Sequence, residues 1–288
     1  MEVYEKNKDV ILENMPDFDL FHTFDCGQCF RWNCENGGFS GVAMGHYLHI
    51  EKADGKFVFK DTDMDTFNRV WRDYFDLGRD YSAIKAELSR DPVLKNAISF
   101  GGGIRILKQD AFECLISFII SASNNIPRIK KIIGLLCENF GEPFPANGAV
   151  YYKFPTADAL SRLSLDDLSV IRAGFRDKYI LAAANAVKSG QLDLGALKKA
   201  SFDYARSQLL RLSGVGEKVA ACILLFGLQK TEGFPVDVWV KRIMEYCYFD
   251  KEQSKETISG FAKDKFGNLG GFAQQYLFYW ARENKIGI

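Results

Sequence analysis

Lys218 has surroundings that suit a nucleophilic amine. It follows the turn "SGVG" (213–216) at the predicted start of a helix, and the residues after it, "VAACILLF", are apolar. The positive end of a helix dipole and apolar burial both disfavour an ammonium ion. A neutral lysine amine can attack an electrophilic carbon and form a Schiff base. The alternative is a solvated surface lysine, which is the commoner case for an isolated example.

Asp237 is a second candidate for chemistry. It lies in the run "FPVDVWVKRI", between apolar residues. A carboxylate in such a setting needs a partner or a task, because desolvating it is costly. It could stabilise positive charge on a reacting molecule, or it could cap the helix predicted from "VWVKRIMEYC". The two roles are compatible.

The turn before Lys218 has the pattern of a nucleic-acid contact. The stretch "LLRLSGVGEKVAACILLF" predicts two helices joined by a turn that contains Gly214, Val215 and Gly216. Glycines bring the backbone close to another surface, and the N-terminus of the second helix suits a phosphate. The pattern is typical of a helix-hairpin-helix, here at about residues 202–228, which grips the DNA backbone without reading its sequence. A plain helical corner is the alternative. Such hairpins can also hold a monovalent cation.

The composition limits the number of domains, the kind of partner and the location that can be expected. The chain has 288 residues, enough for about two domains, and its formal net charge is zero. A nucleic-acid partner would therefore be held by a local patch of charge rather than by a basic surface overall. There is no apolar run long enough to span a membrane, and "MEVYEKNKDV" is neither an export nor a transit signal. We expect an intracellular monomer with reduced cysteines, in the cytoplasm or nucleoid of a prokaryote or the nucleus of a eukaryote.

The hydrophobic periodicity changes along the chain. Residues 28–60 read as antiparallel strands, beginning with "GQCFRWNC" and turning at "ENGG" and "ADG". A helix is predicted from residue 64, and "FGGGIR" (100–105) reads as a linker. Almost everything after it is helical. We therefore expect an α+β protein, with a small antiparallel sheet in an N-terminal domain over residues 1–100 and a larger, all-helical portion over residues 101–288.

The stretch "DCGQCFRW" (25–32) raises the question of a metal or redox site. His22, Cys26, Cys29 and Cys34 have tolerable spacing for zinc. However, residues five apart on a strand point to opposite faces, so Cys29 and Cys34 should not converge. A redox C-x-x-C would be expected beside a βαβ unit, and none is evident. We therefore expect neither zinc nor redox chemistry here.

Taken together, these motifs resemble the HhH-GPD superfamily of DNA glycosylases. The closer resemblance is to the 8-oxoguanine DNA glycosylase/AP-lyases, through "GQCFRW", "SNNIPRI", "LSGVGEK", "GFRDKY" and "GFAQQYLF" in that order over nearly the whole chain. The resemblance implies a helical portion of two subdomains with the active-site cleft between them. It also implies a base-excision repair enzyme that flips 8-oxoguanine out of duplex DNA. No cysteine follows Cys247, so the iron–sulfur cluster of other branches is not expected, and no cofactor or metal is implied.

The resemblance also assigns catalytic and base-binding roles. Lys218 would attack C1′ of the deoxyribose, release the base through a Schiff base and nick the strand by β-elimination, while Asp237 would stabilise positive charge on the sugar. The backbone carbonyl of Gly27 would accept the N7 hydrogen that distinguishes 8-oxoguanine from guanine. The remaining base contacts would be a glutamine on the Watson–Crick edge and two side chains that sandwich the ring: Gln274, Phe278 and Cys222.

Four residues match those that enter the vacated DNA stack and contact the orphaned base: Asn125, Arg128, Phe175 and Arg176. Some positions depart from the family pattern. Ser123 replaces the first of three asparagines, Phe175 replaces a tyrosine, and Trp239 and Ala281 replace a histidine and its acidic partner. These departures put a strict preference for cytosine opposite the lesion in doubt and alter one phosphate contact.

Two other functions remain open from the residues. A non-catalytic helix-hairpin-helix module would bind DNA without releasing a base, and the presence of both Lys218 and Asp237 speaks against it. A glycosylase for another lesion, such as an alkylated purine, would share the same hairpin. Comparing the excision of 8-oxoguanine and 3-methyladenine separates this glycosylase from one that acts on 8-oxoguanine.

Overall fold

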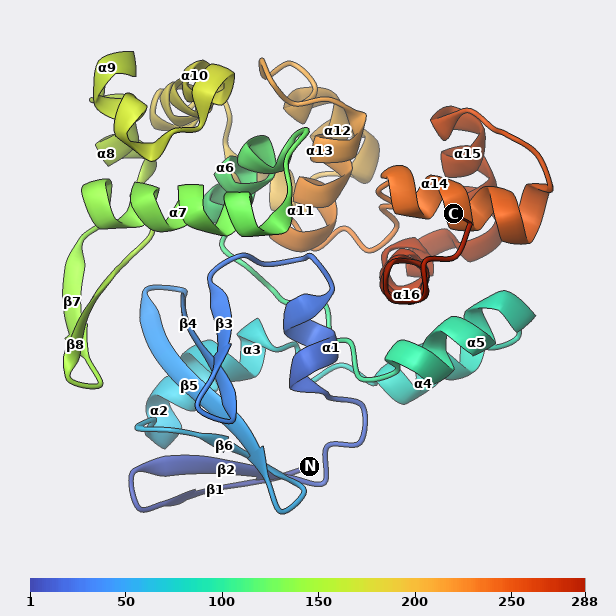
Figure 1. Ribbon diagram of the computed structural model, residues 1–288, viewed down its shortest axis with the longest axis horizontal. Helices are drawn as coiled ribbons and strands as arrows, with labels where there is room; N and C mark the ends of the chain where they lie inside the picture. Colours follow the sequence, from blue (N-terminus) through green and yellow to red (C-terminus); the bar gives the residue numbers. More distant parts are fainter. Residues whose placement is uncertain (288) are drawn as a thin grey trace.

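The computed structural model describes residues 1–287, with an antiparallel sheet at one end and a helical portion at the other (Figure 1). The sheet has six strands in the order β1-β2-β6-β5-β4-β3, with every pair antiparallel. Their bounds are β1 (Glu2–Lys6), β2 (Asp9–Glu13), β3 (Trp32–Glu35), β4 (Gly38–Ala43), β5 (His46–Ala53) and β6 (Lys56–Phe59). The predicted turns join β3 to β4 and β5 to β6, through Asn36–Gly37 and Asp54–Gly55 in left-handed conformations.

The sheet differs from the prediction in two respects. Strands β1 and β2 were not predicted, and they extend the sheet beyond β6. The predicted strand from residue 28 was wrong at its start, because β3 begins only at Trp32. Gly27 has a φ of 74°, which breaks the extended chain after the short helix α1 (Leu20–Asp25). Residues 26–31 therefore form a loop directed toward the helical portion.

A continuous helical segment covers one face of the sheet. It runs through α2 (Met64–Thr66), a wider turn η1 (Phe67–Trp71) and α3 (Arg72–Tyr74). The helical periodicity predicted from residue 64 is confirmed, since the side chains of Phe67, Trp71 and Tyr74 are buried in the core under the sheet. Trp32 of β3 joins this core and donates a hydrogen bond from Nε1 to the Tyr74 hydroxyl at 2.8 Å.

The next two helices, α4 (Tyr81–Leu88) and α5 (Pro92–Gly101), belong to the core of the helical portion. Figure 1 shows them beneath α16 (Gly270–Asn284), which α5 contacts. The prediction of a flexible glycine linker over 100–105 was wrong at its start. A Cβ on Gly101 would lie 2.9 Å from the Tyr279 ring, so this glycine permits close helix packing. The division of the chain after residue 100 stays a prediction.

The rest of the chain is mostly helical, as predicted. Figure 1 shows α6 and α7 beside the sheet and the later helices grouped beyond them. The helices are α6 (Ala111–Ser121), α7 (Ile126–Phe140), α8 (Ala157–Ser161), α9 (Leu165–Leu168), α10 (Asp177–Lys188), α11 (Leu194–Lys199), α12 (Phe202–Leu209), α13 (Glu217–Cys222) with its continuation η4 (Ile223–Gly227), α14 (Val238–Met244) and α15 (Lys255–Phe266). Within residues 1–287, no helix is long and apolar enough to cross a membrane.

A two-stranded ribbon interrupts the helices, so the helical portion is not all-helical. Strands β7 (Pro143–Ala146) and β8 (Ala149–Tyr152) pair through the turn Asn147–Gly148. The Tyr151 ring lies 4.3 Å from that of Tyr47 on β5, so the ribbon contacts the sheet. The Asn-Gly dipeptide is the sequence signal for this hairpin.

A buried polar network connects the two portions. The Arg105 side chain is completely buried, and its guanidinium lies 4.0 Å from the centre of the Tyr81 ring. It donates hydrogen bonds to the backbone carbonyls of Asp17, Phe75, Asp76 and Arg79. Because the cation is fully desolvated, these carbonyls and the neighbouring Asp76 carboxylate must compensate its charge.

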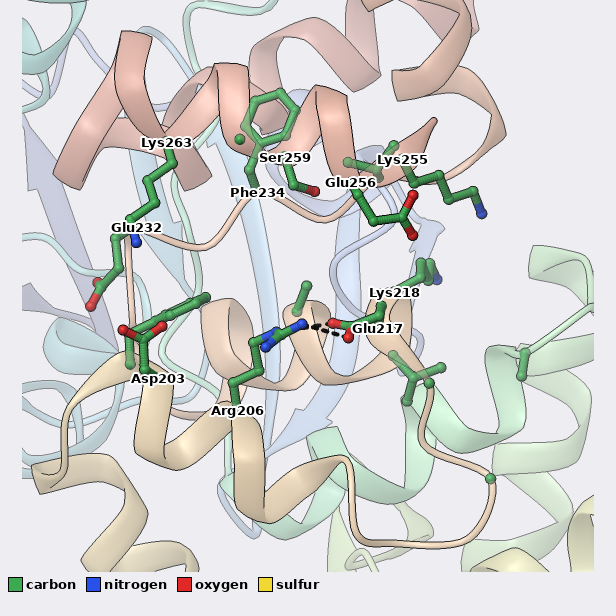
Figure 2. A pocket seen from close by; sticks show the side chains of 18 residues that line it. Asp203, Arg206, Glu217, Lys218, Glu232, Phe234, Lys255, Glu256, Ser259 and Lys263 are labelled. Atoms are coloured by element: carbon green, nitrogen blue, oxygen red, sulfur yellow. Dashed lines mark hydrogen bonds and ion pairs between the residues drawn. The ribbon is translucent and has the colours of Figure 1, made fainter. Parts of the chain in front are cut away.

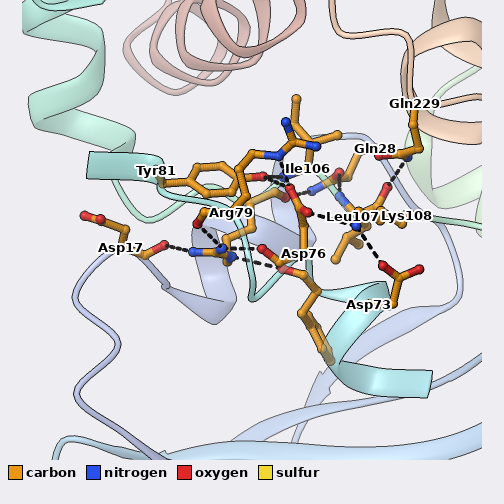
Figure 3. Close-up of polar contacts among 12 residues, drawn as sticks. Asp17, Gln28, Asp73, Asp76, Arg79, Tyr81, Ile106, Leu107, Lys108 and Gln229 are labelled. Carbon is orange, nitrogen blue, oxygen red and sulfur yellow. Dashed lines mark hydrogen bonds and ion pairs between the residues drawn. The ribbon is translucent and has the colours of Figure 1, made fainter. Parts of the chain in front are cut away.

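Gln28 holds the loop that carries Gly27 against residues 105–107, which connect the two portions. Its Nε2 donates to the carbonyl oxygens of Thr23 and Arg105, each at 2.8 Å, and its Oε1 accepts from the Leu107 amide at 2.9 Å. Figure 3 shows Gln28 beside Leu107 in this network. The amide group is buried and fully paired, so the loop has a defined place against residues 105–107.

We expect Arg105→Met to destabilise the fold strongly. It retains an apolar chain but leaves buried carbonyls unpaired, which should lower the free energy of unfolding by about 3 kcal/mol or more. The measurement is urea unfolding followed by circular dichroism. Arg90→Met is the matched control, because Arg90 is exposed and pairs, among residues 1–287, with Glu87 alone, and it should change stability by no more than about 0.5 kcal/mol. Equal effects of the two substitutions would contradict the role of Arg105.

Candidate active site

A small cavity lies where the loop after α1 meets the helical portion. Its volume is about 50 Å³, which has room for a few water molecules. All six residues expected from the sequence to act on the sugar or the base line this cavity. The complete lining is Cys26, Gly27, Phe118, Lys218, Cys222, Phe226, Pro235, Asp237, Gln274, Gln275 and Phe278.

Lys218 and Asp237 approach the cavity from the starts of two helices. Lys218 is half-buried in the first turn of α13, and its Nζ lies 5.5 Å from the centre of the Phe118 ring. Asp237 caps α14, and its Oδ1 accepts a hydrogen bond from the Val240 amide at 2.8 Å. Burial raises the pKa of the Asp237 carboxyl, and this rise is opposed in part by the Val240 hydrogen bond and by the Lys218 ammonium. The helix-cap role expected for Asp237 is confirmed.

Gly27 and Phe278 face each other across the cavity. A Cβ on Gly27 would lie 3.2 Å from Cε1 of the Phe278 ring, so the ring leans on the glycine backbone. The Arg282 guanidinium lies 5.5 Å from the centre of the Phe278 ring and pairs with Asp25 at 2.5 Å. The Phe278 ring therefore contacts Gly27 at the edge of the cavity.

The lining also includes Phe118, Phe226 and Gln275, which the sequence analysis missed, beside the predicted Cys222. Cys222 is buried in α13, and burial raises the pKa of its thiol, so it stays a neutral, compact side chain. Beside it, the rings of Phe118 and Phe226 stack with centroids 5.4 Å apart. Phe118 had no distinguishing signal, because it lies within an apolar helix. Gln275 was detectable, since it adjoins Gln274 on α16.

The two cysteines beside Gly27 belong to different cores. Cys26 lies in the core of the helical portion and also lines the cavity, closer to the site than we expected. Cys29 lies in the core under the sheet, whereas Cys34 is exposed on β3. Burial raises the pKa of the Cys26 thiol to about 12, so this thiol is protonated at neutral pH. The argument that Cys29 and Cys34 share one strand was wrong, because Cys29 precedes β3, but the two differ in burial.

The predicted helix-hairpin-helix is formed by α12, residues 210–216 and α13. Gly214 has a φ of 86°, and a Cβ there would lie 2.4 Å from Cγ of Tyr179, so only glycine fits. Val215 buries its side chain, which anchors the turn. Gly216 is exposed, and its backbone reaches the surface at the start of α13.

A larger hollow of about 680 Å³ lies between this hairpin and α15. Figure 2 shows Lys218 at its margin and Lys255 and Glu256 on the α15 side. Arg206 and Glu217 form an ion pair across the hairpin, with Nε to Oε2 at 2.9 Å. Because Lys218 borders both spaces, the hollow opens directly beside the small cavity.

Three of the residues expected to enter the DNA stack are accessible. Asn125 and Arg128 are exposed at the start of α7, where the Asn125 side chain caps the helix by accepting from the Arg128 amide at 3.0 Å. Phe175 is 58% exposed, so its ring is free to contact DNA. An exposed aromatic wedge is the type of side chain that inserts between bases.

Arg176 is placed differently. It is only 4% exposed, and its guanidinium donates to the carbonyl oxygens of Ala122 and Ser123 at 2.9 and 3.0 Å. Ser123 has a φ of 50°, so this turn is held in a left-handed conformation. In this structure Arg176 therefore supports the turn before Asn125.

The two remaining departures from the family pattern lie on α14 and α16. Trp239 is half-buried, with the Arg242 guanidinium 5.6 Å from its ring centre, and Ala281 is buried. An alanine has no polar group to support a neighbour, which fits the absence of a histidine at 239.

Two family models match the chain in succession. The model described as "8-oxoguanine DNA glycosylase, N-terminal domain" matches residues 10–115, and "HhH-GPD superfamily base excision DNA repair protein" matches residues 116–275. The chain belongs to the HhH-GPD superfamily. Within it, the N-terminal match and the relatives below identify an 8-oxoguanine glycosylase.

Relatives and solved structures with similar sequences support the same family. A probable N-glycosylase/DNA lyase from Methanothermobacter thermautotrophicus is 30% identical, covering 94% of this chain and 95% of the relative. N-glycosylase/DNA lyase OGG1 from Arabidopsis thaliana is 31% identical, covering 89% and 75%. The crystal structure of Clostridium acetobutylicum 8-oxoguanine glycosylase/lyase, in complex with double-stranded DNA containing cytosine opposite 8-oxoguanine, is 46% identical with a TM-score of 0.96, covering 99% of both chains. The glycosylase fold thus extends over the whole chain.

We expect Gly27→Ala to lower the excision of a damaged base by roughly 100-fold, because its methyl group enters the space between the glycine and Phe278. The measurement is single-turnover base release from an 8-oxoguanine duplex. Gly37→Ala is a matched control, because Gly37 has a φ of 78° but nothing lies near its Cβ position. Both substitutions should cost about 1–2 kcal/mol of stability through the left-handed backbone. Equal loss of excision in both would contradict crowding at Gly27.

We expect Asp237→Asn to lower base release by at least about 100-fold while raising thermal stability at pH 7.5. The raised pKa means that the folded protein holds the Asp237 proton more tightly than the unfolded chain. The free energy of unfolding therefore falls as pH rises through that pKa. Asparagine is neutral and still caps the helix. The gain should shrink as pH falls toward about 4, the ordinary aspartate range.

Differential scanning calorimetry at both pH values tests the stability effect. Asp193→Asn is the control, because Asp193 caps α11 in the same way but is exposed. It should not raise the melting temperature. A lower melting temperature for Asp237→Asn at pH 7.5 would show that the carboxylate stabilises the fold.

Proposed function

We propose that this protein is a bifunctional DNA glycosylase/AP-lyase that removes 8-oxoguanine from duplex DNA and then nicks the abasic strand. The observation that carries the proposal is the shared cavity of Lys218, Asp237 and Gly27 with the base-binding residues Cys222, Gln274 and Phe278. An amine, a carboxylate, apolar side chains and an amide group line one cavity. That combination suits chemistry at the bond between a sugar and a base.

The reaction begins when the Lys218 side chain, once it has lost a proton, attacks C1′ of the flipped nucleotide through its amine. The bond between C1′ and N9 breaks, and the base leaves with the electron pair and takes up a proton. Opening of the sugar ring at O4′ then gives an imine between Lys218 and C1′. Loss of a proton from C2′ expels the 3′ phosphate, which nicks the strand. Water releases the sugar fragment from Lys218.

Asp237 acts on the charge that develops during this sequence. The sugar becomes positively charged as the base departs, and a carboxylate held at the edge of the cavity stabilises that charge. Its hydrogen bond to Val240 fixes the carboxylate at the start of α14. The reaction uses no metal or redox cofactor. A monovalent cation held by carbonyls of the hairpin turn would serve DNA binding alone.

Recognition of the lesion rests on Gly27 and Gln274. The Gly27 carbonyl accepts the N7 hydrogen of 8-oxoguanine, whereas the N7 lone pair of guanine would repel it and leave it unpaired. The Gln274 amide meets the Watson–Crick edge, and the Phe278 ring covers one face of the base with Cys222 on the other. An alkylated purine lacks the N7 hydrogen, so this set of groups favours 8-oxoguanine.

Duplex DNA is the partner, and a single copy of the chain suffices for one lesion. The turn at Gly214–Gly216 contacts the backbone, and Phe175 and Asn125 fill the space that the flipped nucleotide leaves. Arg128 and Arg176 border the orphaned base, with Arg176 acting through the turn that it supports.

We propose that the preference for cytosine opposite the lesion is relaxed. The enzyme works wherever the genome lies, in a nucleoid or a nucleus.

We expect sodium borohydride to trap a covalent adduct between the wild-type protein and an 8-oxoguanine duplex, because it reduces the imine. Lys218→Gln should give no adduct, since an amide forms no imine. Lys199→Gln, at an exposed lysine of α11, is the control and should trap as wild type does. Adduct formation by Lys218→Gln, or its absence in wild type, would overturn the assignment of the nucleophile.

A further inference from the structure

Two consecutive glutamines of α16 line the small cavity. Gln274 and Gln275 are 4% and 3% exposed, so both amides are removed from solvent. Successive side chains on a helix point about 100° apart, so a cavity that touches both wraps around part of the helix. A planar base edge in this cavity would meet both amides.

The two amides are linked by one hydrogen bond. Gln275 Nε2 donates to Gln274 Oε1 at 2.8 Å. Gln275 Oε1 is buried and has no hydrogen-bond partner within residues 1–287. Such an unpaired oxygen costs about 1–3 kcal/mol and is rare in folded proteins. Its presence at the wall of a ligand cavity points to a donor supplied by the ligand.

The Watson–Crick edge of 8-oxoguanine offers the required donors. It carries the N1 hydrogen and the 2-amino group side by side, next to the O6 acceptor. Gln274 Oε1 keeps one lone pair free after accepting from Gln275, and Gln275 Oε1 has both. Two adjacent amide oxygens therefore match two adjacent donors. Adenine has an acceptor at N1 and no 2-amino group, so it would leave this pair unsatisfied.

We propose that Gln275 is a second base-reading residue, whose Oε1 accepts a hydrogen bond from the 2-amino group of the flipped 8-oxoguanine. Its Nε2 meanwhile holds the Gln274 amide with its oxygen toward the N1 hydrogen. This inference rests on the proposed function, because it assigns a contact to the substrate named there. It makes the 2-amino group a determinant of excision, in addition to the N7 hydrogen.

The test compares 8-oxoguanine with 8-oxohypoxanthine, which lacks only the 2-amino group. Each is placed opposite cytosine in the same duplex, and single-turnover base release is measured with the full-length protein. Wild type should release 8-oxoguanine at least about tenfold faster, the ratio expected for one buried hydrogen bond. Gln275→Leu should slow the release of 8-oxoguanine by about tenfold and reduce the preference to about twofold or less.

A second variant distinguishes the hydrogen bond that Gln275 accepts from the base from the one that it donates to Gln274. Gln275→Glu retains an oxygen for the 2-amino group and loses the N–H that holds Gln274, so it should retain most of the preference for 8-oxoguanine. Gln253→Leu, at a half-buried glutamine before α15, is the matched control and should behave as wild type does. If Gln275→Leu slows both substrates equally, Gln275 merely positions Gln274 and the proposed contact is wrong.

Cleavage of a preformed abasic site distinguishes a loss of the proposed base contact from a general structural defect and from a failure of the proposed function. This step involves no base, so Gln275→Leu should nick abasic DNA at the wild-type rate, which also shows that the variant is folded. A loss of nicking would mean a general structural defect and would overturn the specific role. If wild type nicks abasic DNA but releases no 8-oxoguanine, the proposed function fails and the Gln275 contact with it.

Discussion

The site depends on the buried hydrogen bonds of residues 103–109, the segment that connects the sheet to the helical portion. Arg105 binds backbone carbonyls of the N-terminal portion, and Gln28 binds the backbone of the same connection from the loop that carries Gly27. An unpaired polar group in this place would be costly, so the hydrogen bonds define one arrangement of loop and connection. Gly27 is thereby held opposite Phe278, although the two are almost the whole chain apart.

Two groups in the site cost folding free energy. Asp237 is buried where its pKa is raised, and Gln275 Oε1 is buried without a hydrogen-bond partner among residues 1–287. In the proposed function, each of these groups has a use once a nucleotide enters. Such local costs concentrate at functional sites because the well-packed remainder of the fold supports them.

The Phe278 ring and Gly27 are in contact at the cavity, whose volume is about 50 Å³. In the proposed function a flipped base takes its place among these side chains, so the Phe278 ring has to shift to admit it. The hydrogen bonds that the correct base forms there would offset the cost of that shift.

The sequence by itself determined the class of fold and most of the chemistry. Lys218 in its glycine turn, Asp237 before its helix and Gln274 four residues before Phe278 are local patterns, and local patterns follow from helix geometry and capping. The tertiary structure decided what no local pattern contains. It placed Gly27 against Phe278, buried Arg176, which was expected to contact the orphaned base, against the turn before Asn125, and left the oxygen of Gln275 without a partner among residues 1–287. The physical reason is that burial and hydrogen-bond partners belong to pairs of residues distant in the chain, and only packing brings such pairs together.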